Sequence, residues 1–284
     1  MRAYLLLAIA VIASSAAPSS QSSSHLTVKN VVARAGRFAE RQRDALTSVR
    51  ADERYMQEIA FPDLNVTERR LLESEIAFVQ LSDSAEWLAF RNVLRVDGVE
   101  TGSDPARLEK LFRLGAVSEQ GRRIAEENAV YNIGRLHRTL NIPTFVLHIL
   151  MPQNSDRFKY RKAAERWLGA DRVWELEYKE RERPTIVRSL DGRAVPLEGR
   201  LWIVPEDGRL VRATLHASVP VTSDLEFEWR HDPGLDTWVP SEMRERYRRI
   251  PDEKSPPKSP RYYDIISRAT YGNYRRFGVD VRIR

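Results

Sequence analysis

The side chains best suited to metal or acid–base chemistry are the five histidines His25, His137, His148, His216 and His231. No two stand four residues apart, the spacing at which a helix presents a pair of metal ligands, and no His-Glu-x-x-His motif occurs. His137 and His148 flank Pro143, but a metal site there would need further ligands. The chain contains no cysteine, so thiolate ligands and nucleophiles are excluded. We therefore predict no metal site and no cofactor.

Hydrolytic chemistry has no recognisable motif in this chain. A Gly-x-Ser-x-Gly elbow is absent, and so are the glycine-rich phosphate loops of nucleotide-binding proteins. Glu126 and Glu127 are adjacent on a predicted helix and point about 100° apart, so they cannot face one sugar as glycosidase carboxylates do. Glu226 and Glu228 share a strand face that we expect to be in water. We predict that the protein is not an enzyme, and keep a hydrolase with an unrecognised site as a third alternative.

Aromatic residues are the first candidates for ligand binding. They fall on predicted strands of the second half, where they would either form the core or line a cavity beneath a curved sheet. These candidates are Trp174, Tyr178, Trp202, Phe227 and Trp229.

A basic stripe is the second candidate for binding. Residues 241–284 carry twelve Lys or Arg against six Asp or Glu, which accounts for the formal +6 of the whole chain. Strand alternation would place Arg244, Arg246 and Arg248 on one face, and Arg249 follows them. Such a stripe would meet anionic lipid headgroups, acidic polysaccharide or an acidic partner, or would serve as a solubilising face that protects an edge strand.

The predicted secondary structure that positions these residues changes along the chain from helix to strand and back to helix. Apolar residues from Val28 to Ala39 recur at three- and four-residue steps, which predicts a helix. Residues 69–81 and 88–96 are typical of strands, and Asp97-Gly98 predicts a hairpin turn. Two further helices are expected, one around residues 108–112 and one over residues 124–140 that ends before Pro143.

Period-two alternation is the clearest pattern of the second half. Apolar and polar residues alternate over 174–178, 211–217, 225–229 and 279–283, and turn residues separate these segments. Short strands with tight turns predict an antiparallel meander rather than a parallel sheet. The predicted fold class is α+β, with a curved, half-barrel-like antiparallel sheet and helices packed on one face. We expect residues 26–170, a part with helices and strands, and the meander 171–284 to form one continuous domain.

The N-terminus predicts export. A basic start, an apolar run over residues 4–13 and small residues up to Ala16 form the pattern of a cleavable signal peptide, 1–16, followed by a serine-rich flexible spacer, 17–25. The apolar run is shorter than the ~20 residues of a membrane-spanning helix, and no cysteine follows for lipidation. We expect a periplasmic or secreted protein without a transmembrane anchor, for which nucleic acid is not a partner.

Part of the chain resembles a known family. Residues 173–178 and 199–212, with the turn Pro205-Glu206-Asp207-Gly208, and the segment 238–243 are similar to the sheet of periplasmic lipoprotein-carrier-like proteins. The resemblance covers residues 170–284, and the chain is also similar to uncharacterised exported bacterial proteins, most clearly over 131–134 and 269–277. It implies an open half-barrel that holds helices in its concave side and acyl chains against an apolar face.

The sequence favours an exported, non-enzymatic protein that binds a lipid or another amphiphilic component of the cell envelope. An envelope interaction or scaffold protein that uses the basic C-terminal face is the alternative. A continuous apolar pocket between the sheet and its helices would separate the two.

Overall fold

The computed structural model describes residues 26–61, 65–80, 87–113, 127, 129–134, 136, 138, 140–181, 184–189, 192–218, 221–249 and 263–277. The side chains of residues 79, 80, 87, 88, 111–113 and 249 are not among those described. The predicted signal peptide and spacer (1–25), the loop 251–260 and the predicted strand 279–283 lie outside the described residues.

The described elements follow one another along the chain as helices and strands of very different length. The helices are α1 (Val28–Leu46), α2 (Arg107–Arg113), α4 (Leu147–Leu150) and α5 (Pro152–Ser155). The strands are β1 (Val49–Phe61), β2 (Val66–Gln80), β3 (Trp87–Val96), β4 (Val99–Glu100), β5 (Phe158–Leu168), β6 (Asp171–Glu180), β7 (Val187–Arg188), β8 (Ala194–Val195), β9 (Glu198–Ile203), β10 (Leu210–Ala217), β11 (Thr222–Asp232), β12 (Thr237–Arg249) and β13 (Tyr263–Arg276).

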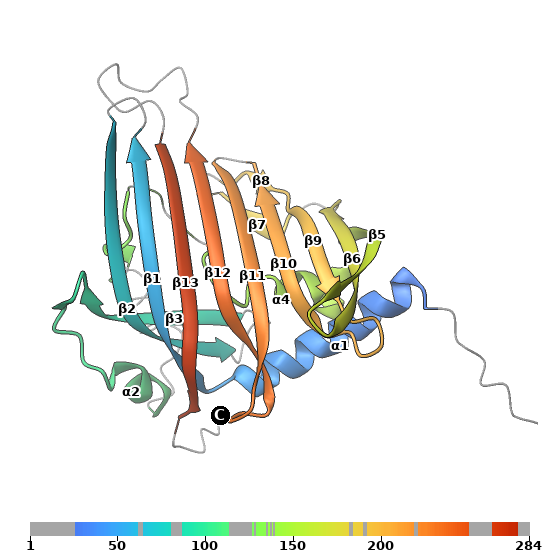
Figure 1. Ribbon diagram of the computed structural model, residues 1–284, viewed down its shortest axis with the longest axis horizontal. Coiled ribbons are helices and arrows are strands. Elements are labelled where there is room, and N and C mark those ends of the chain that lie inside the picture. The colour runs from blue at the N-terminus through green and yellow to red at the C-terminus, as the bar shows by residue number, and fades with distance from the viewer. Residues whose placement is uncertain are drawn as a thin grey trace, which may run out of the picture.

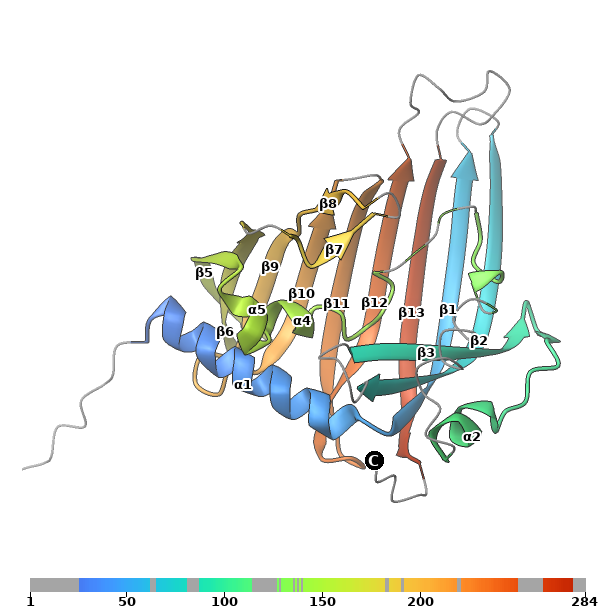
Figure 2. The same cartoon turned by 180° about the vertical axis from the view of Figure 1, so that it is seen from behind.

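Eleven of these strands form one curved sheet in the order β4-β3-β2-β1-β13-β12-β11-β10-β9-β6-β5, with every neighbouring pair antiparallel (Figure 1). The short strands β7 and β8 form a separate hairpin. Helices α1, α4 and α5 and this hairpin lie on one side of the sheet (Figure 2). The predicted fold class, an α+β protein with a curved antiparallel sheet and helices on one face, is confirmed.

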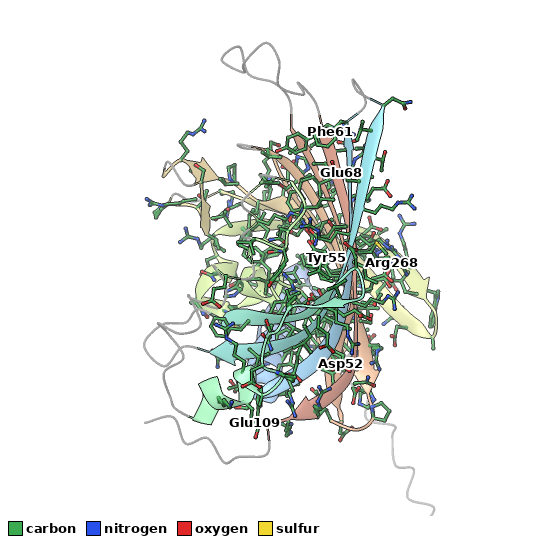
Figure 3. The ribbon with its side chains drawn as sticks, turned by 90° about the vertical axis from the view of Figure 1, so that its left-hand side faces the viewer. Asp52, Tyr55, Phe61, Glu68, Glu109 and Arg268 are labelled. Atoms are coloured by element: carbon green, nitrogen blue, oxygen red, sulfur yellow. The ribbon has the colours of Figure 1, made fainter. Side chains whose placement is uncertain are left out.

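The sheet has an inner face, towards α1, and an outer face on the other side. Because side chains alternate along a strand, residues such as Tyr55 point inward while the exposed Arg268 points outward (Figure 3). Strand β3, which pairs with β2, crosses the inner side of the sheet and lies in front of β1 and β13 in Figure 2. The inner face is thereby enclosed at this edge of the sheet.

Helix α1 lies along the inner face, as its apolar periodicity predicts. Val31, Ala35 and Phe38 are buried against the sheet, and the Thr27 hydroxyl caps the helix by accepting from the Asn30 N–H at 3.2 Å. Each large side chain buried in this way contributes about 1.5–3 kcal/mol relative to leaving it in water. None of the described helices has the length and apolar character needed to cross a membrane.

The helix expected over residues 124–140 is wrong in the part that the structure describes. Residues 127 and 129 are helical, but residues 130–134 are turn and bend. Gly134 has a φ of +79°, outside the helical region. The backbone of Ile133 bonds to side chains instead of to a helix: its N–H donates to Gln57 Oε1 at 3.1 Å and its carbonyl accepts from Arg138 at 2.7 Å. The apolar spacing of this segment therefore reflects packing on the sheet.

A glycine fixes the distance between α1 and the turn that joins β9 to β10. Gly208 has a φ of +79°, and a Cβ built there would lie 2.2 Å from the carbonyl carbon of Arg34 in α1. Arg34 Nη1 donates to the carbonyl oxygens of Pro205 and Glu206, at 2.7 and 3.1 Å. Only glycine allows this approach of two backbones.

We expect Gly208→Ala to lower the free energy of unfolding by about 2–5 kcal/mol, because it combines left-handed strain with a clash against the helix. Gly98→Ala is the matched control, since Gly98 has a φ of +82° with nothing within 4 Å of its built Cβ. This control should cost only about 1–2 kcal/mol. Urea unfolding of both variants checks the prediction, and equal losses would show that α1 does not constrain the turn.

Candidate functional site: the inner face of the sheet

Four of the five candidate aromatic residues lie on the inner face. Trp174, Tyr178, Phe227 and Trp229 are buried there as parts of one apolar core. The Tyr178 hydroxyl donates to the carbonyl oxygen of Thr214 at 2.9 Å, which satisfies its polar end. Their role in ligand binding stays a prediction.

Trp202 lies on the other face of the sheet. Its neighbours Leu201 and Ile203 in β9 are buried inward, so alternation turns the indole outward. The Arg212 guanidinium stacks over the ring at 5.4 Å from its centre. Trp202 therefore cannot contact a ligand on the inner face without a change of strand register.

The inner face is covered by packed side chains. Helix α4 contributes the fully buried Leu147, Ile149 and Leu150, and Val195 and Leu197 come from the β7–β8 hairpin and the residues after it. Open hollows of about 780, 510 and 450 Å³ lie among the described residues. The first is lined by residues of β1 to β4 and β13, including the buried Glu53, Ser74 and Tyr271, and by residues 102–105. The second is lined by strands β10 to β13, and the third by β5, β6, β9 and β10. Over the described residues, the side chains of α1, α4 and the β7–β8 hairpin thus cover the inner face.

Charged side chains interrupt this apolar surface at two places among the described residues: at Glu180 of β6, which accepts from the backbone N–H groups of Ile186 and Leu197, and at a larger group on β1, β3 and β12. Arg91 of β3 binds the buried carboxylate of Glu53 in β1 through two nitrogens, with Nη2 donating to Oε1 at 2.7 Å. The same guanidinium lies 4.8 Å from the ring centre of Tyr55. A bidentate pair of this kind offsets part of the cost of burying both charges.

A second arginine, Arg138, joins the covering segment to the sheet. Its Nη1 donates to the Tyr55 hydroxyl at 2.7 Å and to Gln57 Oε1 at 2.8 Å, and lies 3.4 Å from Ser267 Oγ. The Tyr55 hydroxyl in turn donates to the carboxylate of Glu245 in β12, at 3.0 Å to Oε1. We call these residues the inner polar cluster: Glu53, Tyr55, Gln57, Arg91, Arg138, Glu245 and Ser267.

Burial dominates the protonation of this cluster. It raises the pKa of the Glu245 carboxyl above its ordinary value, against the opposing effect of Arg138. Burial likewise raises the pKa of Tyr55 to about 12, so its hydroxyl keeps the proton that it donates to Glu245. Sequence analysis did not identify the residues of this cluster. Glu53 and Gln57, polar residues at inward positions of β1, were the feature that could have indicated it.

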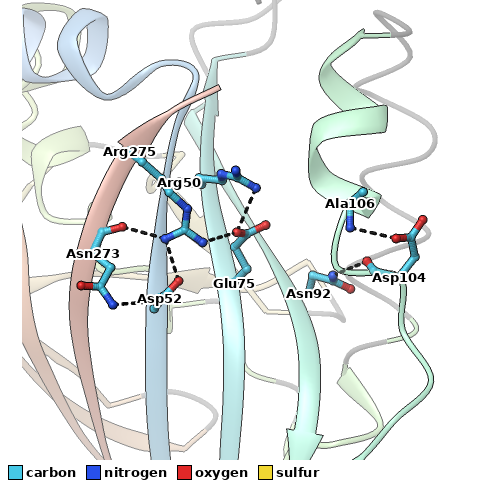
Figure 4. A network of polar contacts seen from close by, with 8 residues as sticks. All are labelled: Arg50, Asp52, Glu75, Asn92, Asp104, Ala106, Asn273 and Arg275. Carbon is cyan, nitrogen blue, oxygen red and sulfur yellow. Dashed lines mark hydrogen bonds and ion pairs between the residues drawn. The ribbon is translucent and has the colours of Figure 1, made fainter. Parts of the chain in front are cut away.

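A different polar network lies on the outer face (Figure 4). Glu75 of β2 accepts from Arg50 Nη1 at 3.1 Å and from Arg275 Nη2 at 2.6 Å, and Arg275 also binds Asp52 at 2.8 Å. Asn92 of β3 donates to the backbone carbonyl of residue 104 at 3.0 Å. These contacts tie β13, β1, β2 and the loop before α2 together, which is a structural role.

The predicted basic stripe is balanced by carboxylates. Arg246 Nη2 and Arg248 Nε bind the two oxygens of Asp264, at 2.8 and 3.2 Å, and Arg244 Nη1 lies 3.3 Å from Glu226 Oε2. The side chain of Arg249 is outside those described. The arginines do share the outer face, as alternation predicts, but paired charges attract a polyanion weakly. Its role as an interaction surface stays a prediction without further support.

One histidine has the partners of a hydrolase triad. His216 Nδ1 lies 2.7 Å from Asp224 Oδ1, and Nε2 lies 2.8 Å from Ser218 Oγ. This is the order of groups in a serine hydrolase. These three side chains lie on the outer face, however, where the Asp224 side chain is 56% exposed. In water such hydrogen bonds stabilise developing charge only weakly.

The other described histidines, His148 and His231, do not belong to the Ser218–His216–Asp224 group. His231 lies 3.3 Å from Asp236 beside a turn, and the ring of His148 packs against Phe145. His25 and His137 are outside the described residues. The part of the chain that the structure describes holds no group of three or more acidic or imidazole side chains placed to bind a metal.

The fold and site define an α+β half-barrel whose inner face, over the described residues, is mostly apolar and holds the inner polar cluster and the buried Glu180. No protein-family model and no curated protein matches the chain. Among solved structures, a DUF1329 family protein from Desulfovibrio piger is 12% identical, with a TM-score of 0.40 over 89% of this chain and 97% of that one.

Two further solved structures are similar to this chain. An outer membrane lipoprotein-sorting protein domain from Vibrio parahaemolyticus is 9% identical, with a TM-score of 0.40 over 87% of this chain and 95% of that one. A LolA superfamily protein from Nitrosomonas europaea is 11% identical, with a TM-score of 0.36 over 90% and 96%. Lipoprotein-sorting proteins, the class that residues 170–284 resemble, are thus among the similar structures. At these TM-scores the likeness is coarse, and we base the function on the chain's own residues.

We expect Glu245 to make stability depend on pH. Because its folded pKa is raised, the folded protein holds a proton that the unfolded chain releases, and the free energy of unfolding falls as pH rises above the ordinary value of 4.5. In Glu245→Gln this group does not titrate, so this decrease in the free energy of unfolding is absent. The variant should therefore become more stable relative to the wild type as pH rises from 4.5 to 8. Urea unfolding at several pH values measures the difference, and a constant difference would contradict the raised pKa.

We expect Ser218 not to be an activated nucleophile. A fluorophosphonate probe, which reacts with activated serine hydroxyls, should label the wild type no more than Ser218→Ala, as measured by peptide mass spectrometry. His216→Gln is the control for the base. Labelling of Ser218 that disappears in His216→Gln would show a working triad and overturn the prediction that the protein is not an enzyme.

Proposed function

We propose that the protein is an exported carrier that holds a lipid or another amphiphile on the inner face of its sheet. The observation that carries this proposal is the apolar inner face itself, which continues across the sheet from β6 to β2. Its buried side chains include Leu176 in β6, Leu201 and Ile203 in β9, Ala213 and Leu215 in β10, Leu225 and Phe227 in β11, Met243 in β12, Ala269 in β13 and Leu72 and Ile76 in β2.

The elements on this face pack on the sheet largely through apolar side chains. Hydrogen bonds also join them to the strands and their turns: Arg34 of α1 donates to the carbonyl oxygens of Pro205 and Glu206, Arg138 donates to Tyr55 and Gln57, and the Tyr160 hydroxyl donates to the Ile149 carbonyl oxygen at 3.0 Å. Moving this layer would cost these hydrogen bonds as well as apolar contacts. An acyl chain restores such contacts at about 0.8 kcal/mol for each buried CH₂ group.

The alternative, a scaffold protein that recruits acidic partners through Arg244, Arg246 and Arg248, has less support. Asp264 and Glu226 already neutralise these arginines. The outer face is a lattice of compensating ion pairs, which suits solubility better than recruitment of a polyanion.

Lipid extraction tests the proposal directly. We expect the mature protein, purified from a bacterial host, to release an amphiphile that mass spectrometry identifies, and N-terminal sequencing to begin at Ala17. Binding of single-chain amphiphiles, measured by thermal shift, should tighten about fourfold for each added CH₂ group. Empty protein with no dependence on chain length would overturn the proposal.

The two tryptophans on opposite faces provide a matched pair for the same assay. Trp174→Ala removes a ring from the inner face and should weaken the binding of a long-chain amphiphile at least tenfold. Trp202→Ala removes the same ring from the outer face and should leave binding unchanged. Equal effects of the two substitutions would mean that the ligand does not lie on the inner face.

A further inference from the structure

We propose that the surroundings of Arg138 bind the headgroup of the carried amphiphile, and that this headgroup is anionic, a carboxylate or a phosphate. The inference rests on the proposed function, because it assigns the ligand of the same inner face. It names the inner polar cluster as the place where the polar end of that ligand binds.

The hydrogen bonds of the cluster leave donors without acceptors. Arg138 has five N–H groups. Its Nη1 donates to Tyr55 and Gln57 and its Nη2 to the Ile133 carbonyl oxygen, but its buried Nε has no acceptor among the described residues. The side-chain amide nitrogen of Gln57, also buried, has none in the same part of the chain. What this site lacks is an acceptor, and carboxylate and phosphate oxygens accept without donating.

The charges point to the same kind of group. Glu53 neutralises Arg91 through two hydrogen bonds, whereas Arg138 forms no ion pair with any carboxylate that the structure describes. Arg138 reaches Glu245 only through the Tyr55 hydroxyl. Burial also favours the protonated, neutral form of Glu245. One negative charge on a ligand would balance Arg138.

The acyl chain has a place next to this headgroup. A small apolar cluster of Ile59, Ile133, Tyr247, Tyr263 and Ile265 is separate from the main core that α1 covers. Its cover is the irregular segment around Gly134, where a built Cβ would lie 3.1 and 3.0 Å from the Cδ1 atoms of Ile59 and Ile265. With its headgroup beside Arg138, a long acyl chain would begin against the isoleucines and continue along the inner face towards the main core that contains Trp174.

The experiment compares matched ligands on the wild-type protein first. Dodecanoate, dodecyl phosphate and neutral dodecanol are titrated by calorimetry, together with inorganic phosphate alone. We expect both anionic amphiphiles to bind at least about tenfold more tightly than dodecanol, since a hydrogen bond to a charged group contributes about 1.5–3 kcal/mol. Inorganic phosphate should bind far more weakly than either, because it has no chain to bury.

Variants then assign the preference to this site. Arg138→Gln, checked for folding by circular dichroism, should bind dodecanoate and dodecanol about equally. Arg268→Gln is the matched control, because Arg268 lies on the outer face with its side chain 61% exposed (Figure 3). This control should keep the wild-type preference.

The outcomes separate the two proposals. If none of the amphiphiles binds, the carrier function itself fails. Equal binding of dodecanoate and dodecanol by the wild type would leave the carrier function standing and overturn the anionic headgroup. A preference that survives in folded Arg138→Gln would overturn the site, and phosphate alone binding as tightly as dodecyl phosphate would show an anion site without a chain.

Discussion

The pairing of β1 with β13 is the constraint on which the inner face depends. The register runs from Val49 opposite Arg276 to Ala60 opposite Asp264, so the strand that follows α1 lies beside the last described strand. This junction places Tyr55 in line with Ala269 and, one strand further, near Glu245 of β12. The inner polar cluster therefore draws on residues from both ends of the chain. A slip of β1 by one residue would turn its Glu53, Tyr55 and Gln57 side chains outward.

The two faces of the sheet treat charge in opposite ways. On the outer face, arginines and carboxylates from neighbouring strands pair mostly near water, where each contact contributes little; Glu75 and Glu175 are the buried carboxylates among them. On the inner face the charged residues are few, and each is held by several hydrogen bonds because an unpaired buried charge costs several kcal/mol. Arg138 Nε and Gln57 Nε2 are among the buried polar atoms that have no partner in the described part of the chain. Each such atom in a native structure requires an explanation, and a bound ligand is the one that we propose for this pair.

Sequence patterns predicted the parts of the fold whose inner face is uniformly apolar. The strands with Trp174, Leu215 and Phe227, and the helix α1, follow from simple periodicity. Strand β1 was harder to recognise because Glu53 and Gln57 occupy inward positions, and these are the residues that make the cluster. Strand β5 was missed because Lys162 and Ala164 follow Phe158 and Tyr160 on its partly buried side, so the apolar alternation ends after two residues. The long helix expected to reach Leu140 failed because its residues bond to the sheet, a tertiary contact that periodicity does not encode.

The same junction of β1 and β13 sets the order in which the chain can fold. Ile59 and Ile265 are opposite one another although about two hundred residues separate them along the chain. Until residues 263–276 have left the ribosome, β1 and β12 both present unpaired edges, and the sheet exists as two incomplete halves. Contacts so distant in sequence make folding slow. The sheet can therefore become continuous only after nearly the whole described chain has been synthesised.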